Sequence, residues 1–95
     1  MTLETITLDE LITRDPNLRG GRPIIAGTVT SVRTIAVMYK HGLSPEAIGG
    51  ELPLTLAQIY AALAYYHLHT DEIEADIIAD AEEQLIAQYG EQLNG

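Results

Sequence analysis

Residues 42–69 read GLSPEAIGGELPLTLAQIYAALAYYHLH, and they carry the start signals of two consecutive helices. Ser44 is a strong N-cap residue, and Pro45 suits the first helical position, where a missing N–H costs no hydrogen bond. Thr55 and Gln58 then form a capping box that opens a longer helix. Two capped helices separated by a short turn are typical of a helix-turn-helix unit.

One helix is expected before this unit and one after it. Apolar residues recur at helical spacing from Val32 to Tyr39, and Gly42 supplies the left-handed residue that ends a helix. After the unit, Asp71 begins a helix that we expect to end near Tyr89. Its apolar residues fall at every fourth position and form a winding stripe, namely Ile73, Ile77, Ala81, Leu85, Tyr89 and Leu93. One flat neighbour cannot cover such a stripe, so its far end is expected to meet a second chain or to fray.

The N-terminal third favours loop and strand. β-branched residues cluster at Leu11-Ile12-Thr13, at Ile24-Ile25 and at Thr28-Val29-Thr30, with a turn-rich segment between the first two clusters. A loose two-stranded ribbon is the expected outcome, although Thr7 and Glu10 also fit a capping box for a short helix. The sequence therefore predicts a mainly α fold, a helix-turn-helix bundle of three to four helices with a short N-terminal β ribbon.

The length of the chain indicates how many domains it forms, and the distribution of charge indicates which kind of partner it suits. The chain has 95 residues, which fits a single domain. Within it we distinguish a strand and loop segment (1–31), a helix-turn-helix core (32–70) and an acidic C-terminal helix (71–95). The net charge is −9, with all five Lys and Arg residues in the first 40 positions and ten of the fourteen acids after them. An acidic half repels phosphates and suits a basic protein partner.

Other classes are disfavoured by residues that the sequence lacks. There is no cysteine, which excludes a disulfide framework and a thiolate metal site. The N-terminus lacks the basic start and apolar run of a signal peptide, and no apolar stretch reaches the ~20 residues of a membrane span. We therefore expect a cytoplasmic protein without membrane contact.

The longest helix of residues 42–69 carries two apolar stripes. One consists of Ile59, Ala62, Leu63 and Tyr66 and is expected to face the core. The other lies on the opposite side and consists of Ala57, Ala61, Ala64 and Leu68. A helix that is apolar nearly all round is a buried helix. The second stripe therefore predicts an interface with a partner protein or with a second copy in a homodimer.

DNA reading is an alternative use of the same helix. A recognition helix enters the major groove with polar residues near its start, and here only Thr55, Gln58 and Tyr60 are available, with no Lys or Arg. Nearby basic residues that could contact DNA are Arg33 and Lys40, and a loop with Arg19 and Arg22 could contact phosphates. The competing interpretation is that these four basic residues pair with the surplus acids. Burial in an interface is favoured over base reading.

The last helix carries an acidic line, Glu72, Asp76 and Asp80, at four-residue spacing. Stacked like charges weaken a helix unless an opposite charge meets them, so a basic partner is one explanation. No nucleophile or pocket-forming motif accompanies these carboxylates, so no catalytic residues are predicted and an enzyme is not expected. His67 and His69 point to opposite sides of a helix and make no metal site. Neither a metal, a cofactor nor a small-molecule substrate is predicted.

The linear order of several motifs resembles the domain-of-unknown-function family 433 (DUF433), from about Leu11 to Asp76. The residues that carry the resemblance are Asp15-Pro16, Gly20-Gly21-Arg22-Pro23-Ile24-Ile25, Gly27-Thr28, Val32, Ile35, Gly42-Leu43-Ser44-Pro45-Glu46, Leu52-Pro53-Leu54-Thr55 and Ala62-Leu63-Ala64-Tyr65-Tyr66. The resemblance implies a homeodomain-like bundle similar to VapB-type antitoxins, which often neighbour a PIN-like nuclease toxin. It brings no catalytic residues. Val29-Thr30 stands where the family usually has an Arg and an aliphatic residue, which weakens a nucleic-acid role for this loop.

Three hypotheses follow, in order of preference. The first is an antitoxin-like interaction protein whose acidic C-terminal helix covers a basic toxin surface. The second is a DNA-binding transcriptional regulator, and the third is a dimeric interaction module with neither toxin nor DNA partner.

Overall fold

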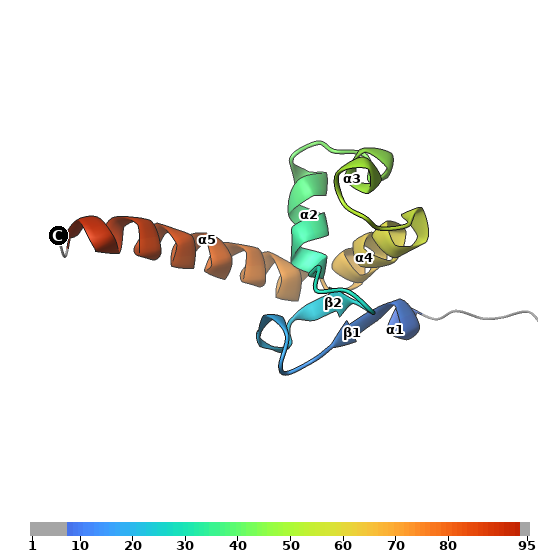
Figure 1. The fold of residues 1–95 in the computed structure, drawn as a ribbon, viewed down its shortest axis with the longest axis horizontal. Helices are drawn as coiled ribbons and strands as arrows, with labels where there is room; N and C mark the ends of the chain where they lie inside the picture. Colours follow the sequence, from blue (N-terminus) through green and yellow to red (C-terminus); the bar gives the residue numbers. More distant parts are fainter. Residues whose placement is uncertain (1–7, 94–95) are drawn as a thin grey trace, which may run out of the picture.

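The computed structural model describes residues 8–93, with side chains placed at 10–81 and at Gln84. Within this range the fold is mainly α, with four helices of seven residues or more and a two-stranded ribbon (Figure 1). The elements are α1 (Leu8–Leu11), β1 (Ile12–Arg14), the 3-10 turn η1 (Arg19–Gly21), β2 (Pro23–Ile25), α2 (Val32–Lys40), α3 (Pro45–Glu51), α4 (Leu56–Leu68) and α5 (Thr70–Leu93). The predicted fold class is confirmed.

Helix starts lie where the capping residues place them. The Ser44 hydroxyl accepts a hydrogen bond from the Ala47 N–H at the start of α3. At the start of α4 the capping box is complete, because Thr55 Oγ1 accepts from the Gln58 N–H and Gln58 Oε1 accepts from the Thr55 N–H. Such bonds satisfy N–H groups that the first helical turn leaves without a partner. Gly42, with φ of 96°, follows the end of α2 in the left-handed conformation that its lack of Cβ permits.

The N-terminal segment contains both structures that the sequence left open. The single turn α1 precedes β1, which pairs antiparallel with β2 so that Ile12 lies opposite Ile25. Thr28-Val29-Thr30 is not a strand, although its composition favoured one. The Thr28 hydroxyl donates to the Ile25 carbonyl and accepts from the Thr30 N–H, which makes a turn instead. That turn leads the chain from β2 directly into α2.

The core forms around α4, which packs against α2 and α3 and also meets the ribbon and α5. The predicted core face of α4 is confirmed, since Ile59, Ala62, Leu63 and Tyr66 are all buried. Isoleucines from neighbouring elements complete the cluster, with Ile12, Ile25, Ile35, Ile48 and Ile73 buried as well. Burial of such side chains contributes roughly 1.5–3 kcal/mol each to folding. The core therefore fixes the orientation of α4 and leaves its opposite side outside the cluster.

The last helix, α5, starts against the core and then leads away from the other helices (Figure 1). Ile73 is buried, Ile77 is partly buried and Ala81 is exposed. The helix runs to Leu93 rather than ending near Tyr89, because a glycine such as Gly90 inside a helix costs only about 1 kcal/mol. The side chains of the remaining stripe positions, Leu85, Tyr89 and Leu93, lie outside the described residues.

The connection between α3 and α4 is short, and the chain direction bends by 120° there. Within the described part of the chain, no single helix has both the length and the apolar character to cross a membrane, and α3 with α4 reaches them only as this bent pair.

Candidate functional site

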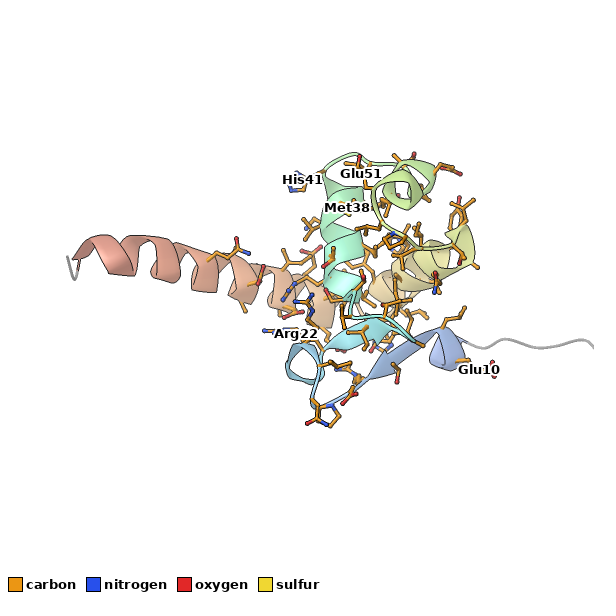
Figure 2. The ribbon with its side chains drawn as sticks, in the orientation of Figure 1. Glu10, Arg22, Met38, His41 and Glu51 are labelled. Atoms are coloured by element: carbon orange, nitrogen blue, oxygen red, sulfur yellow. The ribbon has the colours of Figure 1, made fainter. Side chains whose placement is uncertain are left out.

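The acidic line of α5 is met by arginines from the ribbon and from α2. Glu72 accepts a hydrogen bond from Arg14 of β1, and Asp76 accepts one from Arg22, just before β2. Figure 2 shows Arg22 beside the first turns of α5. We call this group the α5 charge cluster, consisting of Arg14, Arg22, Arg33, Glu72, Asp76 and Asp80. It joins the N-terminal ribbon to a helix more than fifty positions further along the chain.

Asp76 is the centre of the α5 charge cluster. Arg33 Nη1 lies 3.6 Å from Asp76 Oδ1 and 3.5 Å from Asp80 Oδ1, so one guanidinium bridges two successive carboxylates of the acidic line. The side chains of Asp76 and Arg33 are only 14% and 15% exposed. Opposite charges this far from solvent attract more strongly than on the surface. The cluster therefore offsets the repulsion between Asp76 and Asp80 within one chain.

A second ion pair joins α2 to the other side of α5. Lys40 Nζ lies 2.8 Å from a Glu74 carboxylate oxygen, and the Tyr66 hydroxyl donates to the same carboxylate. The hydrogen bond from Lys40, and then the one from Tyr66, hold the pKa of Glu74 below its usual value. The same bonds to Glu74 raise the pKa of Lys40 and that of Tyr66. Lys40, a predicted DNA contact, is thus bound to an acid of its own chain.

Arg19 and Arg22, the two arginines of the predicted phosphate-contacting loop, make separate contacts and do not share one binding site. Arg19 has a φ of 52°, and its Nε donates to the Val29 carbonyl at 2.9 Å, which fixes the turn before β2. Arg22 instead turns toward Asp76. Arg22, Arg33 and Lys40 thus pair with acids, as the competing interpretation predicts, whereas Arg19 binds a backbone carbonyl. Arg14, which pairs with Glu72, was missed because nothing in the local sequence links positions so far apart.

The exposed face of α4 is a different kind of surface. We define it by Leu56, Ala57, Tyr60, Ala64, His67 and Leu68, all of which are exposed. Leu56, Tyr60 and Leu68 keep 45%, 52% and 69% of their surface accessible. No Asp, Glu, Lys or Arg occurs between Leu56 and Leu68. Large exposed apolar groups lined up on one helix are typical of an interaction surface.

Ala61 is a correction to the predicted second stripe. It is only 7% exposed and belongs to the core cluster. The side of α4 opposite the predicted core face is therefore not wholly open, and the N-terminal elements α1 and β1 also contact this helix. Ala57, Ala64 and Leu68 remain on the outside, as a surface for a partner requires. Leu56 and Tyr60 join them, which the sequence pattern did not indicate.

The polar residues at the start of α4 have structural tasks. The Thr55 hydroxyl and the Gln58 carbonyl oxygen are both occupied by the capping box. The Gln58 side-chain NH₂ group is not used in the capping box, and it is the donor that this end of the helix could offer to a base edge. Two exposed acids, Glu46 and Glu51, lie on the neighbouring α3. Their charge opposes the approach of a phosphate backbone.

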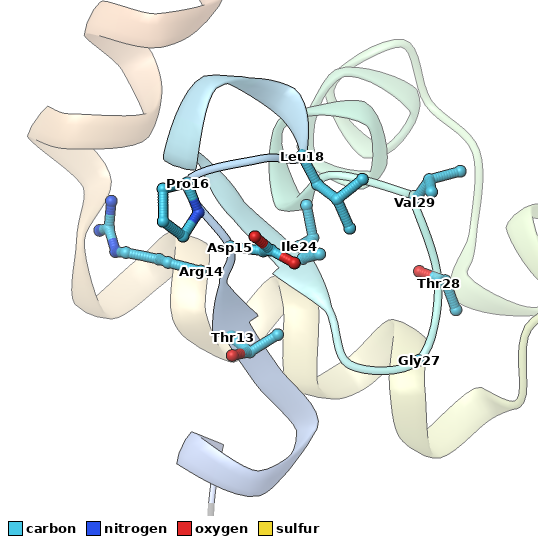
Figure 3. Close-up of a pocket in the computed structure, with 9 residues that line it drawn as sticks. All are labelled: Thr13, Arg14, Asp15, Pro16, Leu18, Ile24, Gly27, Thr28 and Val29. Carbon is cyan, nitrogen blue, oxygen red and sulfur yellow. The ribbon is translucent and has the colours of Figure 1, made fainter.

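An open hollow of about 560 Å³ lies between the turns that flank the ribbon (Figure 3). Its lining residues are Thr13, Arg14, Asp15, Pro16, Leu18, Ile24, Gly27, Thr28 and Val29. Two of its polar side chains make contacts within the fold, since Asp15 accepts from the Asn17 N–H and Arg14 extends to Glu72. Within the described residues, no group of three or more His, Asp or Glu side chains is placed to hold a metal.

These observations define a small, mainly helical domain. One helix has an exposed face without Asp, Glu, Lys or Arg, and four carboxylates of the acidic helix pair with basic residues of the same chain. The chain belongs to the family described as "Protein of unknown function (DUF433)", whose model matches residues 12–66. The predicted family is therefore confirmed, although the match ends near the end of α4 and leaves α5 outside it.

The chain is also similar to a solved structure. The crystal structure of a DUF433 member protein from Anabaena variabilis ATCC 29413 is 26% identical, with a TM-score of 0.69. The similarity covers 75% of this chain and 71% of that chain. A comparison with curated proteins finds no match.

Proposed function

We propose that this chain is an antitoxin-like interaction protein that binds a protein partner with a basic surface, such as a PIN-like nuclease, in the cytoplasm. The observation that supports this best is the projection of α5 beyond the rest of the domain (Figure 1). The sequence of α5, Thr70–Leu93, contains eight acids and no Lys or Arg. A nuclease that binds RNA needs a basic surface, which such a helix complements.

The α5 charge cluster changes which acids are expected to meet the partner. Glu72, Asp76 and Asp80 were predicted as interface residues, but each is paired with an arginine of its own chain. A partner would have to displace those arginines to reach them. The proposal therefore places more weight on positions further along α5, where the sequence continues with Glu82 and Glu83.

The test is co-expression with the protein encoded next to this chain, followed by co-purification and a nuclease assay. We expect capture of a PIN-like partner and loss of its nuclease activity. The double variant E82Q/E83Q should weaken capture at least about tenfold, because close charge pairs across an interface contribute 1.5 kcal/mol or more. The matched control E46Q/E51Q removes the same charge from α3 and should leave capture unchanged. No capture, or equal weakening by both variants, would contradict the proposal.

DNA binding is a second candidate, favoured by the 120° bend between α3 and α4. That angle and the short connection suit a helix-turn-helix unit with α4 as the reading helix. The uncharged α4 and the internal pairing of Arg33 and Lys40 make a weak phosphate surface.

A mobility-shift assay on the promoter of the chain's own gene tests this second function. Electrostatic DNA binding is tightest at low salt, so a shift there that Gln58→Ala weakens would support it. The absence of a shift at low salt would contradict it.

A further inference from the structure

We infer that the exposed face of α4 binds the same face of a second copy, with the two α4 helices antiparallel across a two-fold axis between Tyr60 and Ala64. This inference stands apart from the partner proposed for α5. The observations that carry it are the charge of the face and the order of large and small side chains along it.

The charge of the face selects a second copy over a charged partner. Each chain carries a net charge of −9, so two copies repel each other over most of their surface. A two-fold interface also brings the same patch of both copies together, so acids within that patch would lie near those of the other copy. No Asp, Glu, Lys or Arg occurs along α4, Leu56–Leu68, and its one basic residue is His67. A basic partner, in contrast, would be drawn to the acids of α5.

The order of side-chain sizes along the face is complementary to itself. In the antiparallel arrangement Leu56 meets Leu68 of the partner copy, and Tyr60 meets Ala64 of the partner copy. Each large ring then lies over a small residue, twice by symmetry, with an apolar pair at each end. Small residues let two helices approach toward the 8 Å end of the usual interaxial range.

A neighbouring aromatic residue extends this surface. Tyr39 of α2 is 42% exposed and makes an edge contact with His67, at 6.3 Å between ring centroids. The same antiparallel arrangement places His67 opposite Ala57 of the partner copy. The contact region of α4 is then about 18 Å long, since twelve residue steps separate Leu56 from Leu68.

Four full-length chains test the inference by sedimentation equilibrium: the natural chain, Tyr60→Ala, Ala64→Tyr, and the double variant Tyr60→Ala/Ala64→Tyr. We expect a dimer for the natural chain. Each single variant should weaken it at least about tenfold, because one removes a large interface ring and the other sets two rings against each other. The double variant exchanges the two positions and should recover most of the affinity.

Ile78→Ala is the matched control, because Ile78 is an apolar side chain that is 58% exposed on α5 and does not belong to the α4 face. It should leave the dimer unchanged. Circular dichroism checks that each variant keeps its helices, which we expect because Tyr60 and Ala64 are exposed. A monomeric natural chain, a dimer that none of the α4 variants weakens, or a double variant as weak as the single ones would overturn the inference.

Discussion

Two regions of the molecule, the exposed face of α4 and the acidic line of α5, have surroundings opposite to those that their amino-acid compositions indicate. Leucine, alanine and tyrosine usually lie in a core, yet on this face of α4 they are open to solvent. Carboxylates usually lie free at the surface, yet Glu72, Asp76 and Asp80 are held by arginines of the same chain. Surplus acidic residues therefore need not indicate a charged partner, because they can form ion pairs within the fold. The apolar surface that the fold leaves exposed is the one on which we propose that two copies assemble.

The largest expected effect concerns α4 itself, and it distinguishes the buried side of this helix from the exposed one. The experiment truncates one large residue on each side. Ile59→Ala should lower the free energy of unfolding by about 2–5 kcal/mol, because Ile59 is fully buried. Leu56→Ala should change it by less than about 0.5 kcal/mol in the monomer. Urea unfolding at low protein concentration measures both. Equal losses would mean that the two sides of α4 do not differ in burial.

The next largest effect is a difference in stability between variants of two acids in the α5 charge cluster. Asp76→Asn should cost about 1–3 kcal/mol, because two guanidinium groups lose the shared charge of a mostly buried carboxylate. Glu72→Gln should cost only about 0–1 kcal/mol, since its pair with Arg14 is open to solvent. Both variants are compared by urea unfolding. A larger loss at Glu72 would contradict the assignment of Asp76 as the centre of the cluster.

A smaller effect is expected at the start of α4. Thr55→Ala should cost about 1 kcal/mol, because the helix loses the hydroxyl that accepts from the Gln58 N–H. Thr55→Ser keeps that hydroxyl and serves as the control, with little expected change. Thermal unfolding followed by circular dichroism distinguishes them. Identical melting temperatures for the alanine and serine variants would show that the capping box contributes nothing.

The smallest predicted effect depends on pH and concerns Glu74. Its pKa is lowered in the folded chain, first by Lys40 and then by Tyr66, so the folded state favours the charged carboxylate. The resulting stability is present above the unfolded pKa of about 4.3 and is lost as the pH falls through the lower folded pKa. Unfolding of the natural chain and of Glu74→Gln should therefore differ most above about pH 5 and converge in acid. A difference that grows toward low pH would contradict this sign.

The elements that the sequence predicted correctly are those with local signals. Helix boundaries depend on residues within one turn of the boundary. Ser44 and Thr55 therefore predict where α3 and α4 start, and Gly42 predicts where α2 ends. The sequence indicated that basic residues pair with the surplus acids, but it did not indicate which acid each one meets. The pair of Arg14 with Glu72 could not be predicted, because the two meet only after the ribbon packs on the helices. Ala61 shows the same limit. Helical spacing placed it on the outer stripe, but it is buried in the folded chain.

We propose that two copies assemble through the α4 face, which carries no Asp, Glu, Lys or Arg. The salt dependence of the dimer tests this proposal most directly. Sedimentation equilibrium of the natural chain from about 50 to 500 mM NaCl gives the dimer dissociation constant at each salt concentration. Salt screens the repulsion between two acidic chains and leaves apolar contacts intact. The account therefore predicts that the dimer becomes tighter, or stays as tight, as salt rises. A dimer that weakens steadily with salt would be held by acid–base contacts and would contradict the account.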